Sequence, residues 1–322
     1  MAEGWLEDRP LYVRTSAILS GIRTTQDLIL PEGVEVNTLP VDSDALPLSV
    51  PRARQLPVLD ALGATLLTVD SSISPPLFRP LGEYVPGSVV QLQADDCFRS
   101  VWALCDALAL ATGQFVRPRL FWTDYGEVSA LGSAGDGPVW RAGDPFSERW
   151  KRVSVRTDTA SGTVTLRNRQ PEPPSMSECD LRAAWEIHAG LWERKSNDLR
   201  FRTALERWLR SRRPDLSVED HFIDLRVALE ALYLDGDSGE LAHRLATRLA
   251  WHLGTSPDER KRLFNETRRF YRRASGIVHG GGVRETEIDE RLLDQASSMC
   301  RRALLEHLKS GMPDWGTLVF GS

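Results

Sequence analysis

Three prolines close together, Pro171, Pro173 and Pro174, set the strongest limit on how this chain folds. Proline fixes the backbone angle φ and has no backbone N–H, so neither a helix nor a central strand continues through such a cluster. The side-chain pattern also changes there, from short mixed segments before residue 168 to helical spacing after residue 177. With 322 residues, the chain is long enough for two domains that each bury a core. We therefore predict one domain over residues 1–172 and a second over residues 173–322.

The first domain reads as a mixture of short strands and one helix. Alternating and β-branched residues, bounded by Gly, Pro and Asp, predict strands over Leu11–Leu19, Ser88–Gln93, Phe115–Thr123, Trp150–Arg156 and Thr163–Asn168. The helix is predicted over Asp95–Thr112, because apolar residues recur there at helical spacing after a capping aspartate. This combination predicts an N-terminal mixed α/β domain, and an α+β fold class for the whole chain.

The second domain reads as helical almost throughout. Helices are predicted over residues 178–195, 198–212, 218–234, 239–253, 257–275 and 286–309. Two of them have clear start signals. Ser217 precedes an acidic first turn, and Ser256 is followed by Pro257 at the first helical position and by Glu259 three residues past the cap. These signals predict an all-α bundle.

Composition limits the classes of protein to consider. The chain is 41% hydrophobic and 26% charged, and it has no run of about 18 apolar residues as a membrane span requires. Its acidic start does not resemble a signal peptide, so we expect a cytoplasmic protein with no membrane partner. The cysteines are scattered, which argues against disulfides and zinc and favours buried free thiols: they are Cys97, Cys105, Cys179 and Cys300. We expect no metal and no cofactor.

The net charge of −5 hides an uneven distribution of charge. Residues 181–310 carry 24 basic against 21 acidic side chains, whereas the rest of the chain carries 16 against 24. Basic residues cluster on one predicted helix: Arg260, Lys261, Arg262, Arg268, Arg269, Arg272 and Arg273. Such a stripe suits salt-dependent binding to phosphates, although a solvated helix face would look the same.

The segment from Tyr271 to Gly280 ends this helix and places His279 after two arginines, Arg272 and Arg273. Arginine keeps its charge and offers a planar fork to phosphate, and histidine is the side chain suited to move a proton near neutral pH. If the helix runs unbroken, Arg272 and His279 differ by roughly 20° around its axis, and Arg273 and His279 by roughly 120°. This geometry favours Arg272 as the partner of His279, but Gly276 is a natural place for a break, so both arginines stay candidates.

The region from about residue 177 to residue 308 resembles the Apea-like branch of the HEPN superfamily of helical domains. Three blocks carry the resemblance, namely Asp220–Leu234, Glu240–Ala246 and Tyr271–Gly280. The hallmark of that family is an arginine followed, after four to six residues, by a histidine. The Apea-like form has this arginine where Ala274 stands here, so only Arg273, with five intervening residues, or Arg272, with six, fits the general pattern.

The resemblance implies a metal-independent endoribonuclease that works as a homodimer and serves as a toxin or an anti-phage defence effector. His279 would assist attack of the ribose 2′-hydroxyl, and Arg272 or Arg273 would stabilise charge on the phosphoryl oxygens. We expect Arg268, Arg269 and Arg226 to contact the RNA, with Arg226 also spaced for an ion pair with Glu230. The alternative is an inactive HEPN module that binds RNA or a partner protein as a scaffold, which Ala274 favours.

All six histidines lie at or beyond His188, so the first domain cannot carry out histidine-based chemistry. We interpret it as a recognition or regulatory module, which a regulatory protein partner would suit. An enzyme site in that domain has no supporting motif. In the second domain His243 and His252 lie among apolar residues on one predicted helix, which indicates structural roles for both.

Overall fold

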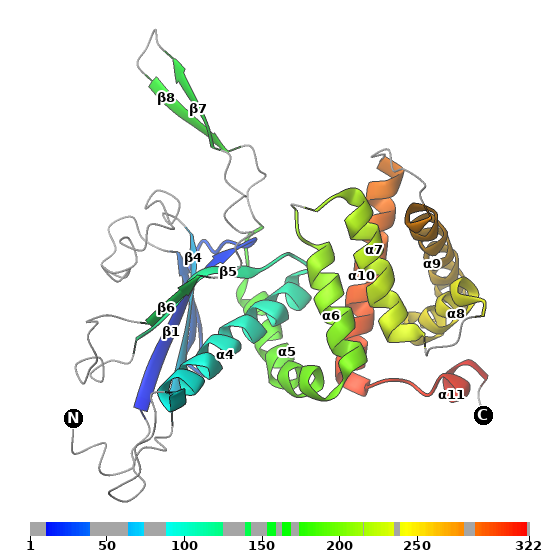
Figure 1. Cartoon of the computed structure of the whole chain (residues 1–322), viewed down its shortest axis with the longest axis horizontal. Helices are drawn as coiled ribbons and strands as arrows, with labels where there is room; N and C mark the ends of the chain where they lie inside the picture. Colours follow the sequence, from blue (N-terminus) through cyan, green and yellow to red (C-terminus); the bar gives the residue numbers. More distant parts are fainter. Residues whose placement is uncertain are drawn as a thin grey trace, which may run out of the picture. The chain divides into compact units, whose positions relative to one another are not determined.

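The computed structural model describes residues 11–38, 64–73, 88–124, 139–142, 153–158, 163–168, 174–214, 216–234, 239–279 and 287–320. Its fold is α+β, as predicted, with an antiparallel sheet in the N-terminal region and helices in the C-terminal part (Figure 1). Contacts divide the chain into two compact units. Residues 1–108 and 116–184 form the first unit, and residues 109–115 and 185–322 form the second. The second unit therefore includes a short segment from the first half of the sequence.

The first unit contains a six-stranded sheet with the order β2-β3-β4-β1-β5-β6. Its strands are β1 (Leu11–Ser20), β2 (Leu28–Leu30), β3 (Val34–Thr38), β4 (Thr65–Ile73), β5 (Arg117–Asp124) and β6 (Val139–Ala142). All neighbouring strands are antiparallel, and β1 pairs with β4 on one side and β5 on the other. Ala17 and Ile18 of β1 are fully buried at the centre of the sheet. Two further strands, β7 (Val153–Asp158) and β8 (Thr163–Asn168), pair with each other.

Helix α4 (Ser88–Thr112) corrects one prediction for this unit. Residues 88–93 were expected to form a strand, but they are the first turns of α4. Once a helix has nucleated, each added residue gains a backbone hydrogen bond, which outweighs the weak strand preference of Val89 and Val90. The predicted strands at β1, β5, β7 and β8 are confirmed, whereas β2, β3, β4 and β6 were not predicted.

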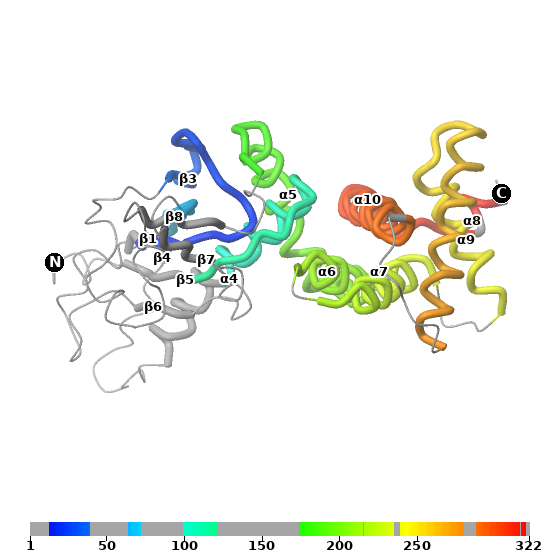
Figure 2. The backbone as a smooth tube through the Cα atoms, turned by 90° about the horizontal axis from the view of Figure 1, so that it is seen from above, coloured from blue at the N-terminus to red at the C-terminus, as the bar shows by residue number. Residues whose placement is uncertain are grey.

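The second unit is a helical bundle whose elements agree closely with prediction. They are α5 (Glu178–Asn197), whose residues up to Ala184 belong to the first unit, and α6 (Leu199–Ser211), α7 (Val218–Tyr233), α8 (Leu241–Leu253), α9 (Pro257–Val278) and α10 (Glu287–Ser310), with a short unpredicted α11 (Trp315–Phe320). Figure 2 shows α6 beside α7 and α8 beside α9. Trp208, Phe222 and Phe270 are fully buried between these helices and fix how they pack.

Side-chain chemistry of the described residues agrees only in part with expectation. Cys105 and Cys300 are buried free thiols, and burial raises the pKa of both. Cys179 is also free but exposed, because it lies on the solvent side of the first turn of α5, and Cys97 lies among side chains outside the description. Within the described ranges no cluster of three His, Cys, Asp or Glu could hold a metal ion, and none of the helices is long and apolar enough to cross a bilayer.

Candidate functional site

Helix α9 carries most of the candidate residues, and its start is firmly capped. The Ser256 side chain accepts a hydrogen bond from the Glu259 backbone N–H, with Pro257 at the first helical position, as predicted. The Glu259 carboxylate accepts from the backbone N–H and hydroxyl of Thr255 and from Arg302 of α10. These hydrogen bonds from Thr255, followed by that from Arg302, lower the pKa of Glu259 to about 2. The cap therefore fixes both the first turn of α9 and its distance from α10.

One face of α9 packs into the bundle and orients the helix. Leu263, Thr267, Phe270, Tyr271 and Ala274 are buried on this face, and Ile277 extends it. Phe264, beside this face, is only half-buried. Ala274 has no exposed surface, so the position where the resembled family has its arginine belongs to the packed core.

The C-terminal end of α9 leads directly to His279. The helix continues through Gly276 without a break and ends at Val278, and the His279 backbone N–H donates to the Ser275 carbonyl at 3.2 Å. The break that Gly276 would allow is therefore absent, and the relative directions of side chains from residue 272 to residue 278 follow the helix period. His279 itself is exposed.

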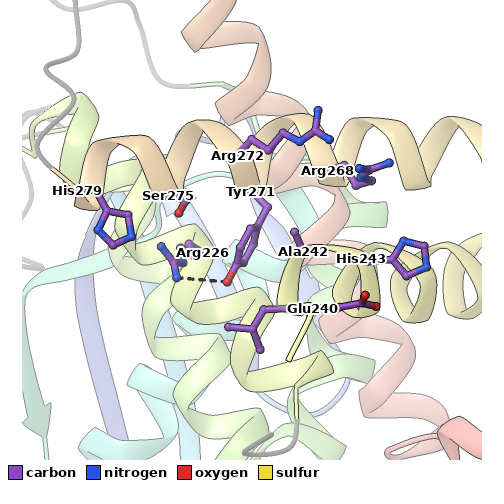
Figure 3. Close-up of a pocket in the computed structure, with 10 residues that line it drawn as sticks. Arg226, Glu240, Ala242, His243, Arg268, Tyr271, Arg272, Ser275 and His279 are labelled. Carbon is purple, nitrogen blue, oxygen red and sulfur yellow. Dashed lines mark hydrogen bonds between the residues drawn. The ribbon is translucent and has the colours of Figure 1, made fainter. Parts of the chain in front are cut away.

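An open pocket of about 920 Å³ lies where α7, α8 and α9 meet (Figure 3). Basic side chains dominate the residues that line it: Arg226, Glu240, Leu241, Ala242, His243, Arg268, Tyr271, Arg272, Ser275 and His279. Figure 3 shows His279 at one end of this pocket and His243 at the other. Among the described lining residues, Glu240 is the only acid.

The structure separates the two candidate arginines. Arg273 does not line the pocket, because its guanidinium forms a bidentate ion pair with the carboxylate of Asp289 of α10, with N···O distances of 2.7 and 2.9 Å. Arg272 is exposed and lines the same pocket as His279, as the helix-angle argument favours. In Figure 3, however, the Arg272 guanidinium points along α9 towards Arg268 and away from the His279 ring.

Arg226 is held in the pocket wall by two neighbours. Its Nε donates to Glu230 at 2.8 Å, so the expected ion pair along α7 is present. Its guanidinium also lies 4.7 Å from the centre of the Tyr271 ring and donates to the Tyr271 hydroxyl, which in turn donates to Glu230 at 2.7 Å. Burial, followed by the Glu230 hydrogen bond, raises the pKa of Tyr271 to about 12. One terminal nitrogen of Arg226, Nη1, is buried and has no hydrogen-bond partner among the described residues.

The remaining predicted RNA contacts differ in position. Arg268 lines the pocket with its guanidinium 5.4 Å from the centre of the Phe264 ring, whereas Arg269 is exposed and is not a lining residue. Arg260 and Arg262 of the same basic stripe are used elsewhere, since Arg260 donates to the Gly254 carbonyl and Arg262 pairs with Glu266. Only part of the stripe therefore faces a possible ligand.

The two histidines of α8 behave differently. His252 is hydrogen-bonded to the buried Tyr233 at 2.9 Å, in keeping with its expected structural role. His243 is exposed at the pocket, with its ring edge against Phe264, so here the structure differs from expectation. Sequence reasoning also missed Glu240 as a lining residue. Helix spacing could not have found it, because Glu240 is the N-cap of α8 and has a left-handed backbone conformation.

Comparison with known proteins identifies no relative of this chain. No protein-family model, no curated protein and no solved structure matches the chain.

Proposed function

We propose that the second unit is a metal-independent endoribonuclease of HEPN type, and that the pocket between α7, α8 and α9 is its active site. One observation carries the proposal: His279 lines a single pocket together with three arginines, Arg226, Arg268 and Arg272. Three cations can bind the phosphates of an RNA strand, and an imidazole can move a proton beside them. This combination suits cleavage of a phosphodiester without a metal.

In this proposal His279 assists the attack of a ribose 2′-hydroxyl on the neighbouring phosphorus. The O–P bond to the next nucleotide breaks, and the products are a cyclic phosphate and a free 5′-hydroxyl. Arg272 neutralises charge on the phosphoryl oxygens after its side chain turns towards His279, a rotamer change that an exposed arginine makes at little cost. Arg226 offers a fixed donor to the same strand, because Glu230 and Tyr271 hold it in place.

One histidine with one arginine at the spacing of the resembled family makes a sparse site, so we include a homodimer in the proposal. The apolar residues Val278 and Ile288 are 50% and 67% exposed on either side of His279 in the sequence. Pairing two copies at this end would cover these residues and bring two sets of donors to one cleft. A toxin or anti-phage effector, restrained by the first unit or by a regulatory protein partner, fits such an enzyme.

A second candidate is an inactive module that binds RNA or a partner protein as a scaffold. Two observations favour it. The family arginine is replaced by the fully buried Ala274, and Arg273 is occupied by Asp289. Of the two arginines that fit the spacing of the resembled family, only Arg272 then remains as a partner for His279.

Cleavage of single-stranded and structured RNA in the presence of EDTA tests the proposal. We expect wild type to cut RNA but not DNA, since DNA lacks the 2′-hydroxyl. His279→Ala should slow cleavage about a hundredfold or more, the usual effect of losing a positioned acid or base. His188→Ala, on α5 and outside the pocket, serves as the matched control and should stay active. If the RNA stays intact but is still bound in a salt-dependent way, the result would support the scaffold function and exclude the nuclease function.

A further inference from the structure

We infer that the end of the pocket opposite His279 is a nucleobase subsite, in which Glu240 and His243 select guanine. The inference rests on the proposed function in one respect, that the ligand is RNA. It adds what that function leaves open, namely which base the protein recognises beside the bound phosphates.

Glu240 has an unusual backbone conformation. It is the one non-glycine residue with positive φ in the described part of the chain, at φ 46° and ψ 38°. A side chain in this left-handed region costs of order 1 kcal/mol or more, and such residues often occur at ligand sites. Glu240 occupies the cap position of α8, yet its carboxylate makes no capping hydrogen bond. Helix capping therefore does not explain its conformation.

The Glu240 carboxylate is available for a ligand. Glu240 is exposed, and no hydrogen bond or ion pair to its side chain occurs among the described residues. Figure 3 shows its side chain directed to the His243 end of the pocket. An acid in the same pocket as three arginines weakens phosphate binding, so its presence indicates recognition of something other than phosphate.

The chemistry of a carboxylate identifies the base. An ionised carboxylate only accepts hydrogen bonds, through two oxygens side by side. Guanine alone among the four RNA bases has two adjacent donors on its Watson–Crick edge, N1–H and the N2 amino group. Adenine and cytosine place a ring acceptor next to their amino group, and uracil flanks its one donor with two carbonyls. Guanine is therefore the base that pairs with Glu240 through both oxygens.

His243 supplies a flat surface next to this carboxylate. Both residues line the pocket, and Figure 3 shows the Glu240 side chain directed towards the His243 ring. The His243 ring is exposed, and its edge-on contact with Phe264, at 5.4 Å between ring centres, holds it in place. Histidine is one of the side chains on which unpaired RNA bases stack. A base on His243 would present its edge to Glu240 while its phosphate reaches Arg268 or Arg272.

Binding of oligonucleotides that cannot be cleaved tests the subsite independently of catalysis. The probes are short 2′-O-methyl oligouridylates that carry one guanosine, inosine, adenosine or cytidine, with fluorescence anisotropy as the readout on the full chain. We expect the guanosine probe to bind about tenfold more tightly than the adenosine and cytidine probes. A difference of this size corresponds to one good bidentate hydrogen-bonded contact with a base. Inosine lacks the N2 amino group and should fall in between.

Glu240→Gln distinguishes base recognition from simple charge. The glutamine removes one negative charge, so affinity for the adenosine and cytidine probes should stay the same or rise, whereas the guanosine probe loses its contact to two carboxylate oxygens and its preference should disappear. Glutamine offers one donor and one acceptor, which suits adenine, so the adenosine probe should gain most. Glu206→Gln on α6 makes the same charge change outside the pocket and should keep the preference for guanosine. His243→Ala should weaken the guanosine probe roughly tenfold, and His243→Phe should restore it.

The outcomes separate this inference from the proposed nuclease. Equal affinities for all probes, or a guanosine preference that survives Glu240→Gln, would overturn the subsite even if the protein cleaves RNA. A guanosine preference that Glu240→Gln removes would establish the subsite even if no RNA is cut, and the protein would then be a guanine-reading scaffold.

Discussion

Arg273 of α9 and Asp289 of α10 face each other in parallel, with Nε 2.7 Å from one carboxylate oxygen and a terminal nitrogen 2.9 Å from the other. The Asp289 side chain is only 5% exposed, and that of Arg273 is 31% exposed. Through this ion pair Arg273 joins α9 to α10, the helices on either side of residues 280–286. The neighbouring Arg272 has no such contact among the described residues.

Arg273→Ala should therefore act on stability. It removes two charge-assisted hydrogen bonds from a buried carboxylate, and we expect the free energy of unfolding to fall by about 2 kcal/mol. Urea denaturation measures the change. Arg269→Ala removes an exposed arginine of the same helix and should stay within about 0.5 kcal/mol of wild type. Equal stability of the two variants would show that the pair with Asp289 contributes little.

Arg272→Ala should act on ligand binding and leave stability unchanged. Arg272 lines the pocket and is exposed, so its loss should weaken RNA binding and reduce the dependence of log affinity on log salt by about 1. Filter binding over a series of salt concentrations provides this slope. Arg262→Ala is the control, since Arg262 pairs with Glu266 outside the pocket. If Arg262→Ala lowers this slope as much as Arg272→Ala does, the result would contradict a role for the pocket in RNA binding.

Ala274→Arg would restore the residue of the resembled family. Because Ala274 is fully buried, we now expect the arginine to overpack the core and to lower the free energy of unfolding by about 3 kcal/mol or more. Ser275→Arg, one residue along and in the pocket wall, should fold normally and bind RNA more tightly. Thermal melts and binding of both variants check this contrast; a stable, more active Ala274→Arg protein would refute it.

Homodimer formation depends on Ile288 if the His279 ends pair. Light scattering should find a dimer for wild type and a monomer for Ile288→Asp, because a charge in a buried apolar contact is costly. Leu199→Asp is a matched change, since Leu199 is equally exposed in the first turn of α6 and should not affect the dimer. If the wild-type protein is a monomer at micromolar concentration, the predicted homodimer is wrong.

Stability should also decrease in mild acid because of His307. This residue is buried against Tyr233 and His252, and its Nδ1 lies 3.1 Å from the Gly311 carbonyl. Burial, followed by the charge of His252, lowers the pKa of His307 from 6.5 to about 4. The unfolded chain therefore takes up a proton at higher pH than the folded chain does, so stability is complete above about pH 6.5 and is lost as the pH falls towards 4.

The slope of this loss identifies the residue responsible. One such group contributes at most about 1.4 kcal/mol per pH unit between these two values. His307→Gln should flatten the curve of unfolding free energy against pH in this window, whereas the exposed His243→Gln should not. An unchanged curve for His307→Gln would assign the acid sensitivity to other groups, such as the neighbouring His252, whose pKa burial also lowers.

The helical half could be predicted well because its signals are local. Ser217 and Ser256 are caps that act on residues three positions away, and they fixed the starts of α7 and α9. Strand β4 was missed for the opposite reason. Its residues from Thr65 to Val69 are buried on both faces in the middle of the sheet, so the alternation that marks a half-buried strand is lacking.

The candidate site was only half visible in the sequence. Arg272 and His279 share a helix, so the helix period was enough to place them on one side. Glu240 and His243 reach the same pocket from α8, and Arg226 reaches it from α7. Nothing local in the sequence relates these residues to His279, because the packing of three helices brings them together. The pairing of Arg273 with Asp289 depends on tertiary structure for the same reason.

The segment 109–115 gives the molecule a particular order of assembly. Arg301 of α10 donates to the carbonyls of Leu110 and Ala111 in this segment, although Leu110 and Arg301 lie 191 residues apart in sequence. At a synthesis rate of about 5–20 residues per second, a ribosome needs roughly 10–40 s to pass from one to the other. During that interval the end of α4 has left the ribosome without the arginine that will bind it. The helical unit can therefore be completed only when almost the whole polypeptide has been translated, which delays any activity of its pocket until the first unit has already been made.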